Sequence, residues 1–400
     1  MWQEGLAKAA ASEEENPACE ALQAPDGGTL VPDPAQRAIT VPMLRKVMQY
    51  VKDHFASGGV WKVTRYVDGQ KKEVEIDDYK EVNLYDVNTH VILAATKERQ
   101  CSLAELMCAE ARPCPPDYFV SHWWGEPVHE FLMCLERHAG DRHADGQIDG
   151  RPVAYWVCAY CNNQHNLDAE INTPLRETSF HRAMTSPSCA GTVVVVDSGA
   201  TVFSRIWCVY EFYLSTNGIH GGHTFDLVTS SNGKEAVCLM DGACHADEKK
   251  TWKPVAQSKA EREAGFPIAL IDKGIRFKCE EAEASYEGDK DRIIEDIRQH
   301  SNESRVNEKV RGLIAAAGSN LVDIDDSREK LEEYLRVVET GKVAKLGIGH
   351  VVKSQEVVSL FLQSASENEL TELFVGTPAI ASAISDGDLL SNFASLAVLK

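Results

Sequence analysis

The sequence has no long apolar run and no excess of basic residues. No stretch approaches the ~18 consecutive apolar residues that a membrane-spanning helix needs. Near the N-terminus, Glu4, Lys8 and Glu13 interrupt the hydrophobic segment that a secretory signal requires. The 61 acidic residues outnumber the 41 basic ones, so the net charge of −20 repels nucleic-acid phosphates and anionic lipids. We therefore expect a cytoplasmic protein that binds no nucleic acid and no membrane.

Common motifs for bound phosphate, calcium and zinc are also missing. The chain has neither G-x-x-x-x-G-K nor G-x-G-x-x-G, and its acidic stretch 280–296 lacks the residue order of a calcium loop. Cys158, Cys161 and His165 resemble half of a zinc site, but no second close pair follows at a suitable spacing. The twelve cysteines are expected to be reduced thiols, and we predict neither a metal nor a resident cofactor. A zinc-stabilised interaction protein stays open as an alternative that a measured metal content would test.

Composition and periodicity divide the chain into four predicted parts. Residues 1–40 are rich in Ala, Glu and Pro and are expected to be a disordered tail. Residues 41–116 should form a helix and hairpin region, 117–280 an α/β domain, and 281–400 a charged helical region. The expected fold class is therefore α/β, with an N-terminal α+β extension and a C-terminal helical region.

Helices outside the central domain are predicted from apolar residues at helical spacing. They are expected at 42–56, 84–97, 102–111, 289–300, 305–317 and 326–338. Ser102 and Glu105 form a capping box at the start of the third. An Asp-Gly turn between alternating residues predicts a β-hairpin over 60–76. The last sixty residues are expected to add short apolar helices.

Strands and helices alternate through the central domain, which predicts a mostly parallel, doubly wound sheet. The expected strands are 118–121, 153–158, 192–196, 224–228 and 267–271. The expected helices are 127–138, 174–184 and 204–217. Ser204 is the expected N-cap of the last helix, and Gly218 the expected stop. Thr192–Val196 is an unbroken β-branched run, so we expect an interior strand that is buried on both faces.

Unusual side chains cluster where these strands end. Ser121, His122 and Trp123 follow the first strand, and Trp207 and Glu211 lie in the helix that follows the third. Because the carboxyl ends of parallel strands meet at one edge of a sheet, these groups should lie at a common rim. Trp207 and Glu211 are four residues apart and would share one helix face, which suits a flat cationic or nucleotide ligand. The alternative is a core tryptophan beside a solvated glutamate.

Several segments resemble known motifs and occur in the same order. Ser204-Arg-Ile-Trp-Cys-Val-Tyr-Glu211 is similar to the Ser-x-Trp-Cys-x-x-Glu helix motif of TIR (Toll/interleukin-1 receptor-like) domains. Phe119-Val-Ser121 resembles the end of the first TIR strand, and the segment 193–197 resembles the third. The segments 121–125 and 156–164 are similar to motifs of fungal heterokaryon-incompatibility domains, which are considered TIR-related.

The resemblance covers roughly 117–230 and implies a flavodoxin-like fold. It also implies cleavage of the nicotinamide–ribose bond of NAD in a signalling or defence response, with Glu211 at the position of the essential catalytic glutamate. The substrate-binding residues would be Ser121, His122, Trp123 and Trp207. NAD would be the substrate, and no further cofactor is implied. The alternative is a non-catalytic module that assembles with copies of itself or with TIR-like partners.

The sequence departs from the TIR pattern in two places. Trp123 and Trp124 stand where many TIR domains carry charged residues. The loop 161–165 differs from the usual turn after the second strand, so nucleotide contacts there cannot be assigned by analogy. The structural alternatives are that Ser121 satisfies backbone groups at a strand end, His122 packs, and the tryptophans fill a core or an interface.

Overall fold

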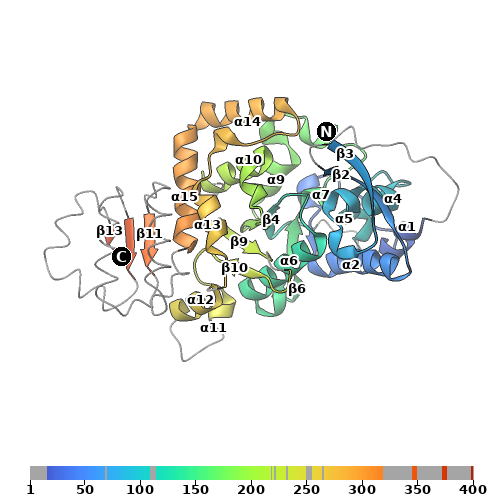
Figure 1. Ribbon diagram of the computed structural model, residues 1–400, viewed down its shortest axis with the longest axis horizontal. Helices are drawn as coiled ribbons and strands as arrows, with labels where there is room; N and C mark the ends of the chain where they lie inside the picture. The colour runs from blue at the N-terminus through green and yellow to red at the C-terminus, as the bar shows by residue number, and fades with distance from the viewer. Residues whose placement is uncertain are drawn as a thin grey trace.

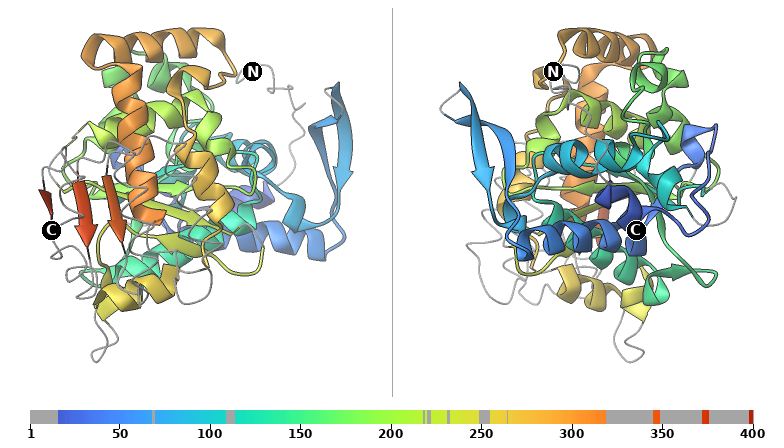
Figure 2. Two further views of the ribbon diagram at one scale, coloured as in Figure 1. Left: turned by 60° about the vertical axis from the view of Figure 1, so that its left-hand side comes forward. Right: turned by 90° about the vertical axis from the view of Figure 1, so that its right-hand side faces the viewer.

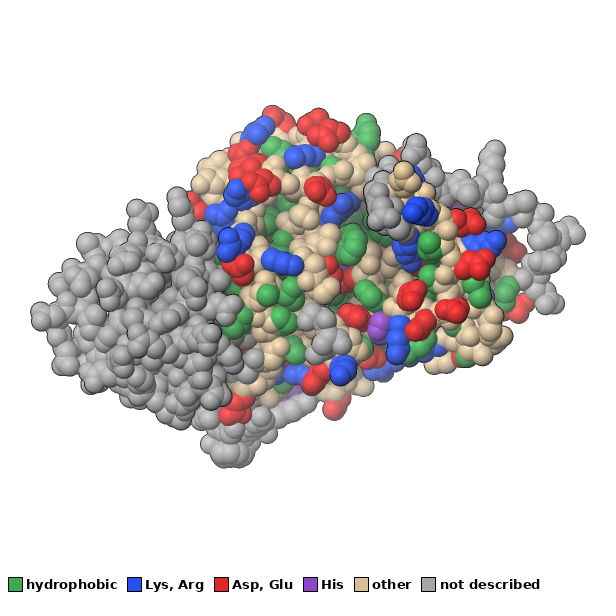
Figure 3. Space-filling model, viewed as in Figure 1, with side chains coloured by type: hydrophobic (Ala, Val, Ile, Leu, Met, Phe, Trp, Pro, Cys, Tyr) green, Lys and Arg blue, Asp and Glu red, His purple; other side chains and the backbone are tan. Residues whose placement is uncertain are grey.

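The computed structural model places a six-stranded sheet at the centre of the molecule, with helices on both faces (Figure 1). It describes residues 16–67, 70–108, 114–217, 219, 222–230, 233–248, 255–263 and 265–318, and three short strands at 345–348, 372–375 and 398–399. On the face drawn in Figure 3, acidic and basic side chains are interspersed over the described surface. Within these ranges no helix is both long and apolar enough to cross a bilayer.

Four parallel strands form the middle of the sheet, and a short antiparallel strand lies at each edge. The order across the sheet is β1 (Ile39–Thr40), β7 (Ala154–Trp156), β4 (Tyr118–Ser121), β8 (Gly191–Val195), β9 (Thr224–Thr229) and β10 (Val237–Leu239). Neighbours from β7 to β9 are parallel, whereas β1 and β10 run antiparallel to β7 and β9. The α/β class and the mostly parallel sheet predicted from the sequence are therefore confirmed.

β8 is the interior strand that the β-branched run predicts. It pairs with β4 on one side and with β9 on the other, and each of its residues is buried. Val193 and Val195 pack into the core on one face of the sheet, while Val194 packs into the core on the other. Burial on both faces explains why the run shows no alternation of polar and apolar residues.

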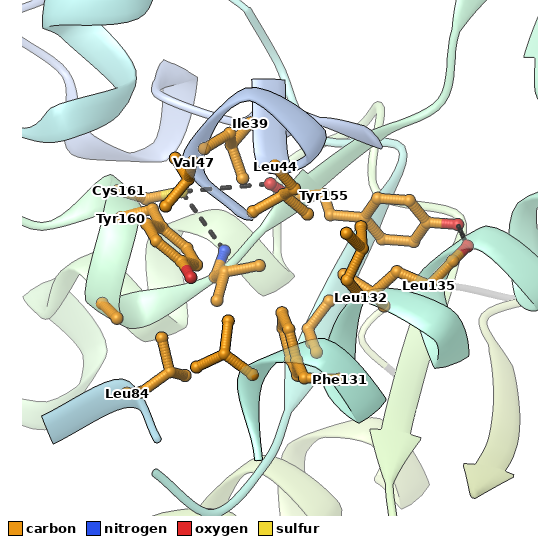
Figure 4. Close-up of a cluster of buried hydrophobic side chains, with 14 of the residues drawn as sticks. Ile39, Leu44, Val47, Leu84, Phe131, Leu132, Leu135, Tyr155, Tyr160 and Cys161 are labelled. Carbon is orange, nitrogen blue, oxygen red and sulfur yellow. Dashed lines mark hydrogen bonds between the residues drawn. The ribbon is translucent and has the colours of Figure 1, made fainter. Parts of the chain in front are cut away.

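Helical layers cover the two faces of the sheet. On one side lie α2 (Val41–Ala56), α6 (Val128–Arg142), α11 (His245–Glu248) and α12 (Val255–Glu263). On the other lie α9 (Ser179–Met184), α10 (Ile206–Thr216), α13 (Ile268–Ile275), α14 (Glu287–His300) and α15 (Glu303–Gly318). Figure 4 shows part of the core beneath α2 and α6, where Phe131, Leu135 and Tyr155 lie together.

The N-terminal region contains the predicted hairpin and helices. β2 (Trp61–Val67) pairs antiparallel with β3 (Gln70–Ile76), and the hairpin projects from the body of the molecule (Figure 2). The helix predicted at 84–97 is present as α3 (Leu84–Val87), a π-helical turn (Asn88–Ile92) and α4 (Leu93–Thr96). α5 (Leu103–Met107) begins with the predicted capping box and ends earlier than predicted.

The disordered tail predicted for 1–40 is wrong from residue 16 onward. α1 (Pro17–Leu22) is a capped helix, and β1 pairs with β7 at the edge of the sheet. Leu22 and Ile39 are buried, so the segment gains enough apolar contact to offset the entropy of ordering it. Residues 1–15 lie outside the described ranges.

Three predicted elements of the central domain differ from the structure. The strand expected at 267–271 is the start of α13, because its apolar residues continue at helical spacing. The helix expected at 174–184 is interrupted, since Thr178 caps α9 after a short 3₁₀ turn. The strand expected at 153–158 is shortened to β7, because α7 (Cys158–Cys161) begins almost directly after it.

The helix that follows β8 begins later than predicted. Ser204 is not its N-cap: this residue ends a 3₁₀ turn and donates a hydrogen bond to the carbonyl oxygen of Thr201. Arg205 occupies the N-cap position of α10 instead. The helix ends at Thr216, and Gly218 lies outside the described residues.

Short turns and one small hairpin connect these elements. The 3₁₀ turns are Pro34–Gln36, Tyr79–Glu81, Ala144–Gly146, Leu175–Glu177, Thr201–Ser204 and Cys279–Glu281. The hairpin consists of β5 (Gln147–Ile148) and β6 (Arg151–Pro152), and α8 (Asp168–Ile171) lies between α7 and α9 along the chain.

The C-terminal region is helical only in its first part. α14 and α15 confirm the first two helices predicted there. Beyond them β11 (Lys345–Ile348), β12 (Glu372–Val375) and β13 (Val398–Leu399) form a parallel sheet, so the expectation of an entirely helical region is wrong. Leu, Ile, Phe and Val in these runs suit strands. The helix predicted at 326–338 lies outside the described residues.

A buried ion pair fastens α6 to the sheet. Asp226 of β9 contacts Nε2 of His138 at 3.0 Å and accepts a hydrogen bond from Nε of Arg142 at 3.1 Å. Nδ1 of His138 lies 2.8 Å from the hydroxyl of Tyr155 on β7. Burial alone would raise the pKa of Asp226, but the bonds and charges of His138 and Arg142 outweigh it and lower that pKa. The carboxylate therefore contributes to stability through its negative charge.

We predict that Asp226→Asn destabilises the fold by about 3 kcal/mol, because it leaves the Arg142 charge buried without its partner. The wild type should have the higher free energy of unfolding, and the full difference should be present above pH 3.8, the pKa of Asp226 in the unfolded chain. Below that pH the difference should shrink, because Asp226 of the wild type becomes protonated. Urea denaturation measures both effects. Asp272→Asn removes an exposed pair with Arg276 and is the matched control, expected to cost less than about 1 kcal/mol. Equal losses in the two variants would contradict the role of Asp226.

Candidate functional site

The predicted rim brings Ser121 and Glu211 into direct contact. Ser121 is the last residue of β4 and pairs in register with Val194 of β8, whose side chain faces α10. Glu211 lies in the middle of α10, and the hydroxyl of Ser121 donates a hydrogen bond to its Oε2. The parallel pairing of β4 with β8 therefore positions the serine beneath the helix that carries the glutamate.

The carboxyl group of Glu211 lies in a dry environment. The residue is only 4% exposed, and Ser121 is fully buried. Burial raises the pKa of Glu211 to about 8, although the hydrogen bond from Ser121 opposes the shift. At neutral pH most of this carboxyl is therefore protonated. A carboxyl that loses and gains its proton near neutral pH is typical of functional sites.

His122 is buried beside Ser121, in a group of polar side chains. Its Nε2 lies 3.7 Å from Sγ of Cys158, and its Nδ1 lies 3.6 Å from Oε1 of Glu126. The ring packs against Phe131, with the two centroids 4.9 Å apart. Burial lowers the pKa of His122 to about 3, while a backbone bond at Trp123 opposes the shift, so the imidazole is neutral.

The two tryptophans after β4 have different surroundings. Trp124 is buried, and its indole N–H donates to Sγ of Cys158 at 3.0 Å. Trp123 is half-buried and folds back over Gly125, where an added Cβ would come within 2.2 Å of the indole. The residue at position 125 must therefore be glycine if Trp123 is to keep this position. Of the two, Trp123 is the one with surface open to a ligand.

Trp207 is held by α9 and α14. Its ring stacks on Phe180 with centroids 5.0 Å apart, and the guanidinium of Arg292 lies 5.0 Å from the ring centroid. Its indole N–H donates to Asp289 at 3.0 Å. The indole of Trp207 thus contacts α9 and α14, whereas the carboxyl of Glu211 contacts Ser121 of β4. That Trp207 and Glu211 serve one ligand surface stays a prediction. A ligand on Trp207 would have to displace Phe180 or Arg292.

Two residues near the rim were not selected from the sequence as site residues. Glu126 stands four residues after His122, and Cys158 begins α7 directly beyond β7. The signals in the sequence were their place after two successive strands and, for Cys158, its spacing from Cys161 and His165. Whether they face each other depends on how the strand ends pack, which no local pattern encodes.

The three residues weighed as half of a zinc site have separate partners. Sγ of Cys161 accepts a hydrogen bond from the backbone N–H of Val157 at 3.2 Å (Figure 4), and Nε2 of His165 lies 2.9 Å from the hydroxyl of Thr96. Cys158 contacts Trp124 and His122, as described above. Among the residues that the structure describes, no three His, Cys, Asp or Glu side chains are placed to hold a metal ion.

Two surface hollows lie away from this rim. One, of about 680 Å³, lies between α2 and α6 and is lined by residues that include Lys52, Tyr79 and His129. The other, of about 570 Å³, is lined by α14 and Glu280. Neither is lined by Ser121 or Glu211.

No protein-family model matches the chain, and neither a curated protein nor a solved structure is significantly similar to it. The function must therefore be argued from the motifs and the geometry of the rim.

The raised pKa of Glu211 leads to a prediction about stability. The folded carboxyl keeps its proton up to about pH 8, whereas the unfolded chain releases it near 4.5. Because the folded state binds more protons between these values, the stability of the wild type should fall as pH rises from 4.5 to 8. The glutamine of Glu211→Gln does not titrate. The free energy of unfolding of this variant, relative to that of the wild type, should therefore rise between pH 4.5 and pH 8. We expect a change of at least ~1.4 kcal/mol, the value of one pKa unit.

Urea denaturation of both proteins at pH 5 and pH 8 measures this difference. Ser121→Ala removes the hydrogen bond that favours the ionised form and should make the effect of pH larger. The difference in free energy of unfolding between the wild type and Glu211→Gln should change with pH. If it is the same at pH 5 and pH 8, the carboxyl of Glu211 does not lie in a dry environment.

Proposed function

We propose that the region 117–280 is a TIR-like domain that cleaves the nicotinamide–ribose bond of NAD, with Glu211 as the catalytic residue. The observation that carries this proposal is the hydrogen bond between Ser121 and Glu211 at the carboxyl edge of the sheet. Both residues belong to the segments that resemble TIR motifs. The two residues are 90 positions apart in the chain. If the motif matches were accidental, we would not expect the two side chains to be in contact.

The strand order supports the same proposal. Taken in chain order, the four parallel strands β4, β7, β8 and β9 lie in the sheet as second, first, third and fourth. This is the beginning of the 2-1-3-4-5 order of flavodoxin-like folds, in which ligands bind outside the ends of the first and third strands. Ser121 ends the first of these strands, and α10 follows the third. The pair therefore lies where this fold class places a ligand.

The proposed chemistry requires a carboxylate and a leaving group that departs without protonation. As the bond to nicotinamide breaks, positive charge develops on the ribose, as in glycoside hydrolysis. An ionised Glu211 would stabilise that charge and hold the ribose hydroxyls. Nicotinamide leaves as a neutral ring, so no general acid is needed. In this proposal Ser121, which donates to the carboxyl, contacts the substrate together with its chain neighbours His122 and Trp123.

The buried carboxyl implies that the described conformation is a closed one. Glu211 is 4% exposed and largely protonated at neutral pH, so it can neither touch NAD nor supply a negative charge. Opening the rim would expose Glu211 to water and to the cationic nicotinamide ring. Both would favour the ionised carboxylate and would therefore lower the pKa of Glu211. Substrate entry and activation of the glutamate would then be the same event.

A second function is favoured by two observations. Glu211 is buried, and α14 covers Trp207. Both features stabilise the fold without exposing the residues to a ligand, as expected of a non-catalytic TIR-like assembly module. In that case Glu211 is a structural residue, and the domain would act by binding copies of itself or TIR-like partners. NAD turnover separates the two functions.

We predict that the purified protein consumes NAD and that Glu211→Gln lowers the rate at least ~100-fold, the usual cost of losing one charge-stabilising group. The substitution keeps the size of the side chain and removes its negative charge. Nicotinamide release, followed by chromatography at several protein concentrations, measures the rate. Glu308→Gln, on the exposed side of α15, is the control and should leave the rate unchanged. An active Glu211→Gln variant would exclude this mechanism, and a wild type without turnover at any concentration would favour the assembly module.

A further inference from the structure

Cys158 lies among groups that can activate a thiol. Its sulfur accepts a hydrogen bond from the indole N–H of Trp124 at 3.0 Å and lies 3.7 Å from Nε2 of His122. The backbone N–H groups of Cys158 and Ala159 also act on the sulfur and favour its thiolate form. Donors on one side and an imidazole nitrogen on the other are the surroundings of a cysteine nucleophile.

The far nitrogen of the imidazole faces a carboxyl group. Nδ1 of His122 and Oε1 of Glu126 lie 3.6 Å apart. Both atoms are buried, and neither has a hydrogen-bond partner in the described structure. Burying a polar atom without a hydrogen-bond partner lowers the stability of the fold, so such atoms call for an explanation. A role in function is one explanation. A small approach of the two side chains would let Nδ1–H donate to the carboxyl and would fix the imidazole with Nε2 toward the sulfur.

The fold explains why these three residues meet. His122 follows β4 and Cys158 follows β7, and the two strands are parallel neighbours with Phe119 opposite Trp156. Their carboxyl ends therefore lie side by side. Glu126 comes four residues after His122, at the start of α6, and reaches back to the same imidazole.

We propose that Cys158, His122 and Glu126 form a thiol–imidazole–carboxyl triad that transfers acyl groups from small activated esters or thioesters. This activity is separate from NAD cleavage and does not depend on it. In this arrangement Cys158 is the nucleophile, His122 the general base and Glu126 a positioning residue.

The reaction uses only these groups, the ester and water. The sulfur of Cys158 attacks the carbonyl carbon while its proton passes to Nε2 of His122. The bond from carbon to the leaving oxygen then breaks, and His122 returns the proton to that oxygen. Water then takes the place of the alcohol: it attacks the carbonyl carbon of the thioester and gives a proton to His122, the carbon–sulfur bond breaks, and the proton returns to the sulfur of Cys158. In this proposal the N–H groups of Cys158 and Ala159, which act on the sulfur in the resting site, donate to the oxyanion that forms in each half of the reaction.

Small substrates are favoured because Cys158 is largely buried. Cys158 is 9% exposed, and it lies beneath Trp124, against which the 46% exposed Tyr85 packs. Burial raises the pKa of Cys158 to about 12, although the bond from Trp124 opposes the shift, so the resting thiol keeps its proton. The proton must therefore move to His122 during attack. Cys208, also buried, donates its thiol to the carbonyl oxygen of His122 and is hydrogen-bonded to the hydroxyl of Ser121 rather than to an imidazole.

The test is acetylation of the full-length protein by p-nitrophenyl acetate, with peptide mass spectrometry to locate the acetyl group. We expect an initial burst of p-nitrophenol and a thioester at Cys158. Cys158→Ala should abolish the burst, and His122→Ala should lower its rate at least tenfold. Glu126→Ala should lower it as well, while Glu126→Gln, which keeps an oxygen for Nδ1–H, should restore part of it. Cys161→Ala, beside the triad but bonded to the backbone of Val157, is the control and should react as the wild type does.

A measurement on the wild type alone keeps the proposal testable if a variant fails to fold. Iodoacetamide should alkylate Cys158 at least tenfold faster than the more deeply buried Cys161 and Cys208, as followed by peptide mapping. Equal alkylation of the three thiols would overturn the proposal. So would a burst that survives in folded Cys158→Ala or that is unchanged in folded His122→Ala.

Discussion

The exclusion of water from the carboxyl edge of the sheet is the constraint on which the rest of the structure depends. Parallel pairing brings the ends of β4, β7 and β8 together, and α10 closes over them. A polar group at this edge must find a partner or stay neutral, because an unpaired charge away from water is costly. Ser121 meets Glu211 for this reason, and both Glu211 and His122 are held in their neutral forms.

Contacts from outside the central domain keep the edge closed. α3, from the N-terminal region, places Tyr85 against Trp124, and the backbone N–H of Leu84 donates to the carbonyl oxygen of Trp124. α14, from the C-terminal region, supplies Asp289 and Arg292 to the ring of Trp207. The candidate site residues and their neighbours therefore contact all three regions of the chain.

Local sequence patterns predicted the elements that depend on local physics. The β-branched run gave an interior strand because burial on both faces selects for it, and Ser102 with Glu105 gave a capping box because three-residue spacing closes that motif. Patterns failed where distant contacts decide. Residues near Ile39 are held by pairing with β7 and by other distant contacts, such as the hydrogen bond from Trp156 to the carbonyl oxygen of Pro34. Trp207 faces α14, which lies some 80 residues further along the chain.

The protonation of Glu211 tests the account most directly. A carboxyl-carbon NMR titration of protein labelled at glutamate, assigned with Glu211→Gln, would measure its pKa in the folded state. The account predicts a value of about 8, because burial outweighs the hydrogen bond from Ser121. A value near the ordinary 4.5 would contradict it, since the edge of the sheet would then be open to water.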